Sequence, residues 1–203
     1  EIHAFFQRNG SREFVQFGRD WDINRVARYY LFSNALRRRG LAGAAGRIAN
    51  ECLLAVQNRL HYSRLARRAE SVKKGSQWFS ITHALARFVL ANKTKIDFFR
   101  HSAAPDEHFL QTLVFNSPFY ERLYSWTEED PRANMLLVDW QRSERRGSPH
   151  VFRESDFESL VASDMLFARK FDENVDRAII DRVFEAVCER QRRPRPGSAT
   201  GGK

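Results

Sequence analysis

The stretch GSQWFSITHALARFVLA, residues 75–91, decides the fold class because its pattern changes part-way along. Residues 77–81 are short, apolar and aromatic, which is typical of a buried strand. Thr82 then offers an N-cap to a helix over residues 83–91, where the apolar positions recur at helical spacing. A strand that leads directly into a helix indicates an α/β or α+β fold.

Short strands and helices alternate along the rest of the chain in the same way. The pattern predicts strands within residues 13–17, 135–140 and 166–171. It predicts helices within residues 1–9, 24–39, 48–70, 105–116, 154–161 and 175–187, with an interruption at Gly40, Gly43 and Gly46. Residues 192–203 carry Pro and Gly but no apolar run, so we expect a flexible tail there.

Composition excludes several classes of protein. With 203 residues, 42% hydrophobic and 29% charged, the chain can build a core and is not a disordered protein. Its apolar runs fall short of the roughly 20 residues that a membrane-spanning helix needs. The two cysteines, Cys52 and Cys188, form no CxxC pair, so no cysteine-based zinc or redox motif is expected.

Positive charge is concentrated in one part of the chain. The net charge is +9, yet residues 25–74 hold twelve Lys and Arg against only two Glu, so the remainder is close to neutral. Within this block one apolar stripe recurs every fourth residue: Ile48, Cys52, Val56 and Leu60. A basic amphipathic helix indicates either a surface for an anionic membrane or nucleic acid, or a solvated face. No nucleic-acid-binding motif accompanies it, so we predict docking on an anionic membrane and no nucleic acid partner.

Four short blocks, in this order and at these separations, resemble glycosyltransferase family 14. That family holds the core-2/I-branching β-1,6-N-acetylglucosaminyltransferases and the peptide O-xylosyltransferases. The resemblance is good over residues 75–187, loose over residues 1–40, and nearest to the bacterial members. The blocks are Gly75-Ser76-Gln77-Trp78-Phe79, Pro105-Asp106-Glu107-His108-Phe109, Asn116-Ser117-Pro118 and Phe167-Ala168-Arg169-Lys170-Phe171-Asp172.

The resemblance implies a GT-A-like α/β fold and inverting transfer of GlcNAc or xylose from a UDP-sugar. The acceptor would be a hydroxyl of a glycan, a peptide or a lipid-linked molecule. No metal cofactor is expected, because the family lacks the DxD metal motif. The family's nucleotide-binding half would lie upstream of Glu1, so residues 1–191 are expected to be the C-terminal, acceptor and catalytic portion, with residues 25–74 a basic helical insertion. We expect a cytoplasmic protein at the inner face of the membrane.

Inverting transfer needs a base that takes the proton of the acceptor hydroxyl as it attacks C1. Glu107 follows Pro105 at a predicted helix start, and by resemblance it occupies the family's catalytic-base position. The alternative is that a first-turn Glu only complements the helix dipole. Its neighbour Asp106 is interpreted as a cap.

The leaving diphosphate needs positive charge when no metal is present. Lys170 matches a basic position shared by both branches of the family, and Arg169 matches the xylosyltransferase branch. Because neighbours on a strand face opposite sides, the alternative is an edge strand with one charge on each face. The core-2 branch has a further Arg where this chain has Gly147, and the nearby substitutes are Arg142, Arg145 and Arg146.

Acceptor contacts are predicted at Trp78 and Trp140, for which core packing is the alternative. The resemblance implies acceptor contacts at Arg25 and Arg28 as well, because they fall where the family's acceptor-side residues lie. A zinc site at His101 and His108 is not expected, because Pro105 separates them. Two other functions stay open, a non-catalytic basic module that binds anionic membrane or nucleic acid and a catalytically inactive fragment. The salt dependence of function distinguishes the binding module from an enzyme, because binding to a phosphate backbone weakens steeply as the salt concentration rises, whereas sugar transfer should change only modestly.

Overall fold

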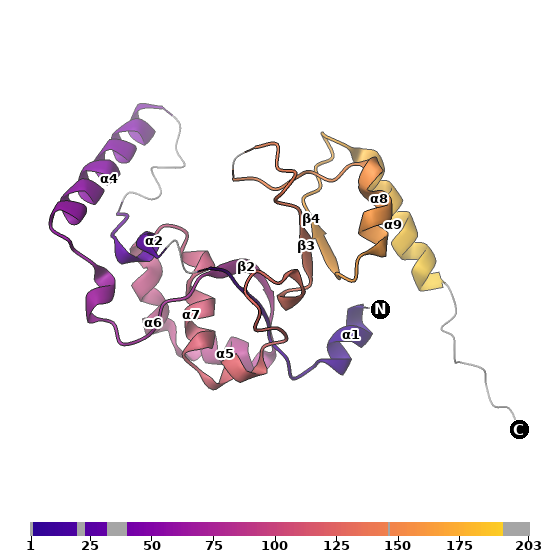
Figure 1. Ribbon diagram of the computed structural model, residues 1–203, viewed down its shortest axis with the longest axis horizontal. Coiled ribbons are helices and arrows are strands. Elements are labelled where there is room, and N and C mark those ends of the chain that lie inside the picture. The colour runs from indigo at the N-terminus through magenta and orange to yellow at the C-terminus, as the bar shows by residue number, and fades with distance from the viewer. Residues whose placement is uncertain (1, 20–22, 32–39, 146, 193–203) are drawn as a thin grey trace, which may run out of the picture. The chain divides into compact units, whose positions relative to one another are not determined.

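The computed structural model describes residues 2–19, 23–31, 40–145 and 147–192 (Figure 1). They divide into two compact units, each described by itself: Ser11–Asn134, and Glu1–Gly10 with Met135–Lys203. The predicted flexible tail lies outside the described residues from residue 193 onward. So do Arg37, Arg38 and Arg39 of the basic block.

The unit Ser11–Asn134 is mixed, with one small sheet among helices. Its elements in chain order are β1 (Phe14–Phe17), α2 (Asn24–Ala27), α4 (Leu41–Arg59), η2 (Arg64–Arg67), β2 (Gly75–Ser80), α5 (His83–Ala91), α6 (Lys93–Asp97), η3 (Phe98–His101), η4 (Pro105–Glu107), α7 (Phe109–Phe115), η5 (Pro118–Arg122) and η6 (Pro131–Ala133).

Strands β1 and β2 pair antiparallel, with Val15 opposite Phe79 and Phe17 opposite Gly75. The predicted strand at residues 77–81 therefore exists, but the prediction that it is buried is wrong, because its central residues are exposed. The reason is that, within the described ranges, β2 pairs with no strand other than β1, and β1 is the strand that carries the buried side chains. Residues from β1, α5 and α7, with the leucine that follows η5, build the main core: Val15, Phe17, Leu85, Leu110, Val114 and Leu123.

A buried carboxylate joins β1 to the start of α5. Glu13 is fully buried, and it accepts hydrogen bonds from the backbone N–H of Thr82 at 2.8 Å and from its hydroxyl at 2.6 Å. The Thr82 hydroxyl oxygen in turn accepts from the backbone N–H of Leu85, which confirms the predicted N-cap. The helix of the deciding stretch is thus fixed to β1 through the residue that immediately precedes that strand.

Gly75 is required by a close approach of the two strands. A Cβ at this position would lie 1.9 Å from the carbonyl oxygen of Gln16 and 2.8 Å from the side chain of Gln111. The group that approaches this glycine so closely is the backbone of the neighbouring strand β1.

We expect Gly75→Ala to destabilise the protein by about 1–3 kcal/mol, because the added methyl group forces the strand backbone to shift. The measurement is the midpoint of urea unfolding. Gly18→Ala is the matched control, because a Cβ there would meet only an ordinary contact at 3.9 Å. Equal midpoints for the two variants would contradict this account of Gly75.

Helix α4 differs from its prediction at both ends. It begins at Leu41 and so contains Gly43 and Gly46, which were expected to interrupt the chain, and it ends at Arg59 rather than near residue 70. Both glycines are buried, together with Asn50 and Gln57 on the same face. The helix continues through both glycines despite their low helix propensity, as tertiary context commonly allows.

The predicted helix over residues 24–39 is shorter in the described part, because α2 ends at Ala27. Arg28 is extended, and the backbone N–H and C=O of Tyr29 are both hydrogen-bonded to the side chain of Gln57, at 2.8 and 3.1 Å. These contacts replace the hydrogen bonds that a continuing helix would make. Residues 32–39 lie outside the described residues.

The other unit contains a strand–helix–strand crossover. Its elements are α1 (Ile2–Arg8), β3 (Leu136–Val138), η7 (Glu154–Asp156), α8 (Phe157–Ala162), β4 (Phe167–Arg169) and α9 (Arg177–Arg192). Strands β3 and β4 are parallel, with Leu136 opposite Phe167 and Val138 opposite Arg169. Parallel neighbours need a long crossover, and here it contains α8. None of the helices in the described part of the chain has the length and hydrophobicity that a bilayer crossing needs.

Candidate functional site

Glu107 is the last residue of the short turn η4, and one residue separates it from α7. The single helix predicted over residues 105–116 is divided, because His108 has a non-helical backbone between the two elements. Pro105 opens the turn, and η4 packs against β2. The sequence prediction of a carboxylate held at a helix start after a proline therefore holds in outline, with a 3₁₀ turn in place of the first helical turn.

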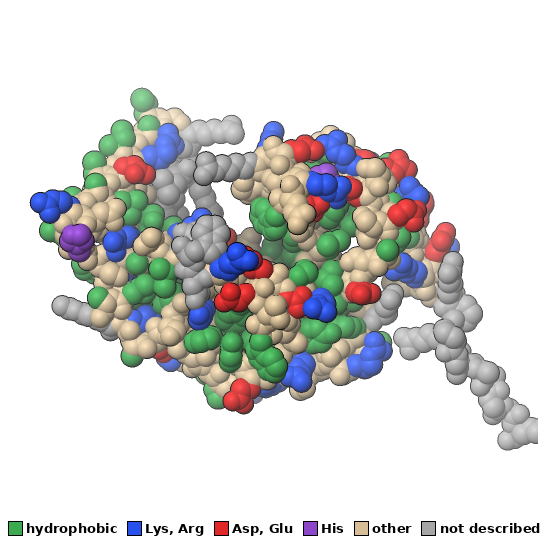
Figure 2. Space-filling view, in the orientation of Figure 1, with side chains coloured by type: hydrophobic (Ala, Val, Ile, Leu, Met, Phe, Trp, Pro, Cys, Tyr) green, Lys and Arg blue, Asp and Glu red, His purple; other side chains and the backbone are tan. Residues whose placement is uncertain are grey.

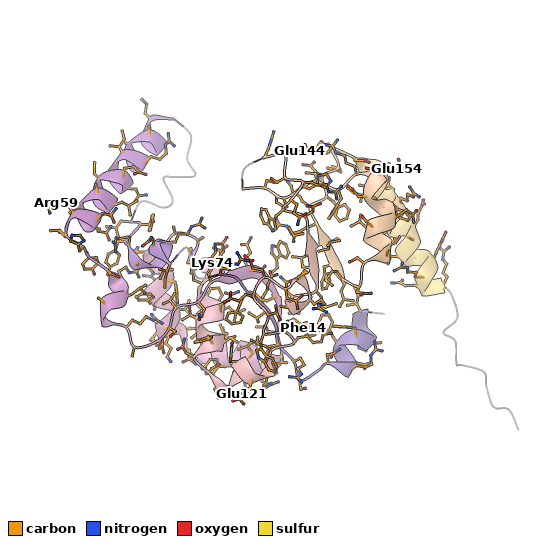
Figure 3. The ribbon with its side chains drawn as sticks, viewed as in Figure 1. Phe14, Arg59, Lys74, Glu121, Glu144 and Glu154 are labelled. Carbon is orange, nitrogen blue, oxygen red and sulfur yellow. The ribbon has the colours of Figure 1, made fainter. Side chains whose placement is uncertain are left out.

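Two cations hold the carboxylate of Glu107. The guanidinium of Arg25 donates to Oε2 at 3.4 Å, and the ammonium of Lys74 lies 3.6 Å from the same oxygen. Lys74 immediately precedes β2 (Figure 3), and Arg25 belongs to α2, so three separate segments meet at this carboxylate. The side chain keeps about a third of its surface exposed, so it remains within reach of a ligand.

His108 is hydrogen-bonded to the residue that precedes the turn η4. Its Nδ1–H donates to the carbonyl oxygen of Ala104 at 2.9 Å, and the ring is buried. Burial lowers the pKa of His108, and the hydrogen bond to Ala104 opposes this only in part. The ring is therefore neutral at physiological pH, and it adds no charge beside Glu107.

The predicted acceptor residues of this unit separate into two groups. Trp78 lies on β2, the strand against which η4 packs, and half of its surface is exposed. Arg25 pairs with Glu107. Arg28 instead donates to the side chain of Asn58 at 3.0 Å and to the backbone carbonyl of Tyr62, so it fastens α2 to α4.

In the other unit, the carboxyl ends of β3 and β4 form one edge of the sheet, as they must in a parallel pair. The backbone of His150 donates to Asp139 at 2.8 Å, and that of Phe152 donates to Lys170 at 2.9 Å. The loop after β3 thus returns to cover the ends of both strands. Ligand sites in α/β sheets commonly form at such carboxyl edges.

Lys170 follows the last residue of β4, which is Arg169. Both side chains are partly exposed. No carboxylate among the described residues pairs with the ammonium group of Lys170. Its positive charge is therefore available to an anion.

Arg142 has a different environment. Its guanidinium donates to Asp139 at 2.5 Å and to Asp156 at 2.6 Å, and these two carboxylates raise its pKa. Asp156 is buried and also accepts hydrogen bonds from the backbone N–H of Arg153 at 2.8 Å and from Nε2 of His150 at 3.0 Å. Burial would raise the pKa of Asp156, but these three donors outweigh it and lower the pKa to about 2.

The residues at this edge surround a pocket of about 480 Å³. Trp140 and Arg142 line it from the loop after β3, and Ser159 and Ser163 line it from the region of α8. Trp140 is 57% exposed. An indole face beside hydroxyl and guanidinium groups is suited to stacking and hydrogen bonding with a sugar or a nucleoside.

The network of Arg142, Asp156 and His150 was missed by sequence reasoning. Asp156 belongs to no recognised sequence motif. The only local signal for a structural role is that Arg153 and Asp156 form a capping box at η7. Arg146 lies outside the described residues, and no three His, Cys, Asp or Glu side chains of the described ranges are grouped so that they could hold a metal ion.

Comparison with protein families decides the class. The family model named Core-2/I-Branching enzyme matches residues 37–165, more than half of the chain. The chain belongs to the Core-2/I-Branching enzyme family. Membership implies a glycosyltransferase, with a sugar donor and a glycan acceptor. No curated protein matches the chain.

The Core-2/I-Branching match includes α4 and the first three of the four blocks on which the sequence resemblance rests. Glu107, Trp78, Trp140 and Arg142 lie inside it. Lys170 and Arg169 lie beyond its end, and so do Arg25 and Arg28 beyond its start. The family match therefore gives no support for the roles predicted for these four residues, and their surroundings in the structure are the evidence that remains.

Proposed function

We propose that this member of the family is an inverting, metal-independent glycosyltransferase with a GT-A-like fold. It moves GlcNAc or xylose from a UDP-sugar to a hydroxyl of a glycan, peptide or lipid-linked acceptor. The observation that carries the proposal is the family match, within which Glu107 is fixed at a helix start by two cations.

Glu107 acts as the base. Its carboxylate accepts the proton of the acceptor hydroxyl while the hydroxyl oxygen bonds to C1 of the sugar and the bond from C1 to the diphosphate breaks. Arg25 and Lys74 are positioning residues, because both contact Oε2. Trp78, exposed on the adjacent strand, offers an aromatic face to the acceptor.

Lys170 and Arg169 bind the diphosphate and stabilise the negative charge that develops as UDP leaves. The support for Lys170 is that no described carboxylate neutralises it. Arg142 already shares its guanidinium between Asp139 and Asp156, which favours a role in shaping the pocket over a direct contact with phosphate. Trp140 in that pocket would stack on a sugar ring or on the base.

The test is transfer of labelled sugar from UDP-GlcNAc and UDP-xylose to hydroxyl acceptors, with and without EDTA, by the full-length protein. We expect transfer from one of the two donors, unchanged by EDTA and with inversion at C1. Failure with both donors, or loss of activity in EDTA, would contradict the proposal and favour a non-catalytic module or a metal-dependent enzyme.

Lys170→Ala should weaken UDP binding or turnover roughly tenfold to a hundredfold, since a hydrogen bond to a charged group contributes about 1.5–3 kcal/mol. The melting temperature should stay unchanged, because no described carboxylate loses a partner. Lys93→Ala, at an exposed position in α6, is the matched control. A lower melting temperature with unchanged kinetics would show that Lys170 is structural.

A further inference from the structure

Helix α4 presents its apolar side to solvent. We call the residues at every fourth position the apolar stripe of α4: Ile48, Cys52, Val56 and Leu60. Ile48, Val56 and Leu60 are 65%, 56% and 71% exposed, and Cys52 is an exposed free thiol. Figure 2 shows hydrophobic side chains along this helix at the surface.

The inward face of the same helix buries no large apolar side chain completely, and Leu53 and Leu54 are only half-buried. It buries Asn50 and Gln57 together with two glycines, and Gln57 is satisfied by the backbone of Tyr29. A helix that packs on its own protein normally buries its apolar face. In α4 the apolar stripe is exposed instead. A monomer in water gains no free energy by exposing contiguous apolar surface, so we read the stripe as a surface that binds a partner.

An apolar groove of about 360 Å³ continues the stripe. Aliphatic side chains and two tyrosine rings line it, and Leu60 belongs both to the groove and to the stripe. The rings of Tyr29 and Tyr62 stack with their centroids 6.0 Å apart. The residues that line the groove are Tyr29, Leu31, Leu53, Gln57, Leu60 and Tyr62.

The charges around the stripe and groove are mostly positive. Arg47 and Arg59 are exposed on α4, and Figure 3 places Arg59 at its C-terminal end. Arg28 donates to Asn58 and to a backbone carbonyl. Arg64 lies over the ring of Tyr29 at 4.5 Å and donates to the hydroxyl of Ser102 at 3.1 Å and to the carbonyl oxygen of Phe98, so these two arginines add positive charge without being free to bind a ligand. In the described part of the chain no carboxylate pairs with any of these four arginines, and Glu51 is the one acidic residue in α4.

We propose that the apolar stripe and the groove dock on the anionic surface of a lipid bilayer. The stripe enters the boundary between headgroups and acyl chains, the exposed Arg47 and Arg59 contact the anionic headgroups, and the groove takes a hydrocarbon chain. A second copy of this chain is the poorer partner, because pairing the stripes would bring two positively charged surfaces together with only Glu51 of each α4 to oppose them.

The first test places a fluorophore in the stripe. Cys52 is one of two cysteines, so an environment-sensitive dye can be attached to it alone in the Cys188→Ser background. We expect a blue shift with vesicles of phosphatidylglycerol and phosphatidylcholine, but not with pure phosphatidylcholine. The shift should decrease from 50 to 200 mM salt, because screening weakens attraction between exposed charges.

The second test measures sedimentation of unlabelled variants with the same vesicles. Ile48→Glu should lower the partition coefficient at least about tenfold, because it removes one large apolar side chain from the bilayer and adds a like charge. Arg59→Gln should lower it about fivefold, the contribution of one basic residue near an anionic surface. Leu90→Glu is the matched control, since Leu90 on α5 is 63% exposed and lies outside the stripe.

Several results would overturn the proposal. These are no binding to anionic vesicles at low salt, binding that Ile48→Glu leaves intact, or equal losses in Ile48→Glu and Leu90→Glu. A dye shift that needs no vesicles and grows with protein concentration, together with Cys52 cross-linking between copies, would assign the stripe to a dimer. These assays contain no sugar donor, so their failure leaves the proposed activity untouched.

Discussion

Glu107→Gln is expected to reduce turnover at least about a hundredfold, because a positioned base typically contributes 10²–10⁴-fold. An acceptor hydroxyl is a poor nucleophile at neutral pH, and it must lose its proton as it bonds to C1. The amide keeps the size of the side chain but cannot accept that proton. The measurement is kcat at saturating donor and acceptor in the full-length protein.

The fold should survive this substitution. The ion pairs of Glu107 with Arg25 and Lys74 are long, at 3.4 and 3.6 Å, and partly exposed, so their loss costs little, about 1 kcal/mol or less. Asp106→Asn is the matched control, because Asp106 is an exposed carboxylate in the same turn. Normal turnover in Glu107→Gln with a loss in Asp106→Asn would assign the base to Asp106.

Asp156→Asn is expected to give the largest loss of stability, about 2–4 kcal/mol. The buried carboxylate accepts hydrogen bonds from Arg142, His150 and the backbone of Arg153, and removing one partner of a buried pair leaves the others unsatisfied. Because Arg142 is half exposed, water recovers part of the loss there. Hydrogen exchange over residues 136–171 measures where the variant opens.

The same substitution should change the response to acid. The folded-state pKa of Asp156, about 2, lies below its ordinary value of 3.8, so its stabilisation is complete above the ordinary pKa and is lost as the pH falls through the lower one. The shift corresponds to roughly 2 kcal/mol. Wild type should therefore lose more stability than Asp156→Asn between about pH 4 and pH 2.

A surface carboxylate provides the comparison. Asp181 pairs with Arg177 one turn away on α9 at 3.5 Å, and both side chains are well exposed. Asp181→Asn should change stability by less than about 0.5 kcal/mol. If Asp156→Asn behaved in the same way, the network at the sheet edge would have no structural role.

Local sequence was sufficient for most elements and for the class. The strands near residues 13–17, 135–140 and 166–171, and the N-cap at Thr82, follow from alternation and from capping chemistry, both of which act between near neighbours. Family membership was also recognisable in the blocks around Trp78 and Glu107, and the family match confirmed it.

Elements that depend on distant partners were predicted less well. The helix expected after Asn24 stops at Ala27 because Gln57, some thirty residues later, binds the backbone of Tyr29. No run of Gly, Pro or Ser marks the division of the chain after Asn134. Neither the contact between Gln57 and Tyr29 nor the division of the chain leaves a signal in the neighbouring sequence.

The sequence by itself determined the mixed α/β class and the family, because both rest on residue types at short, fixed spacing. The choice of Glu107 as the candidate base came from the family resemblance and stays a prediction. Only the tertiary structure decided which face of α4 is buried, since two glycines and two amides can pack inward only where a partner surface fits them. It also decided the surroundings of the charges. Glu107 meets Arg25 across 82 positions of the chain, and Arg142 meets Asp156 rather than remaining unpaired as Lys170 does within the described residues. The energy of a charge depends on the groups that folding brings beside it, and spacing along the chain does not specify them.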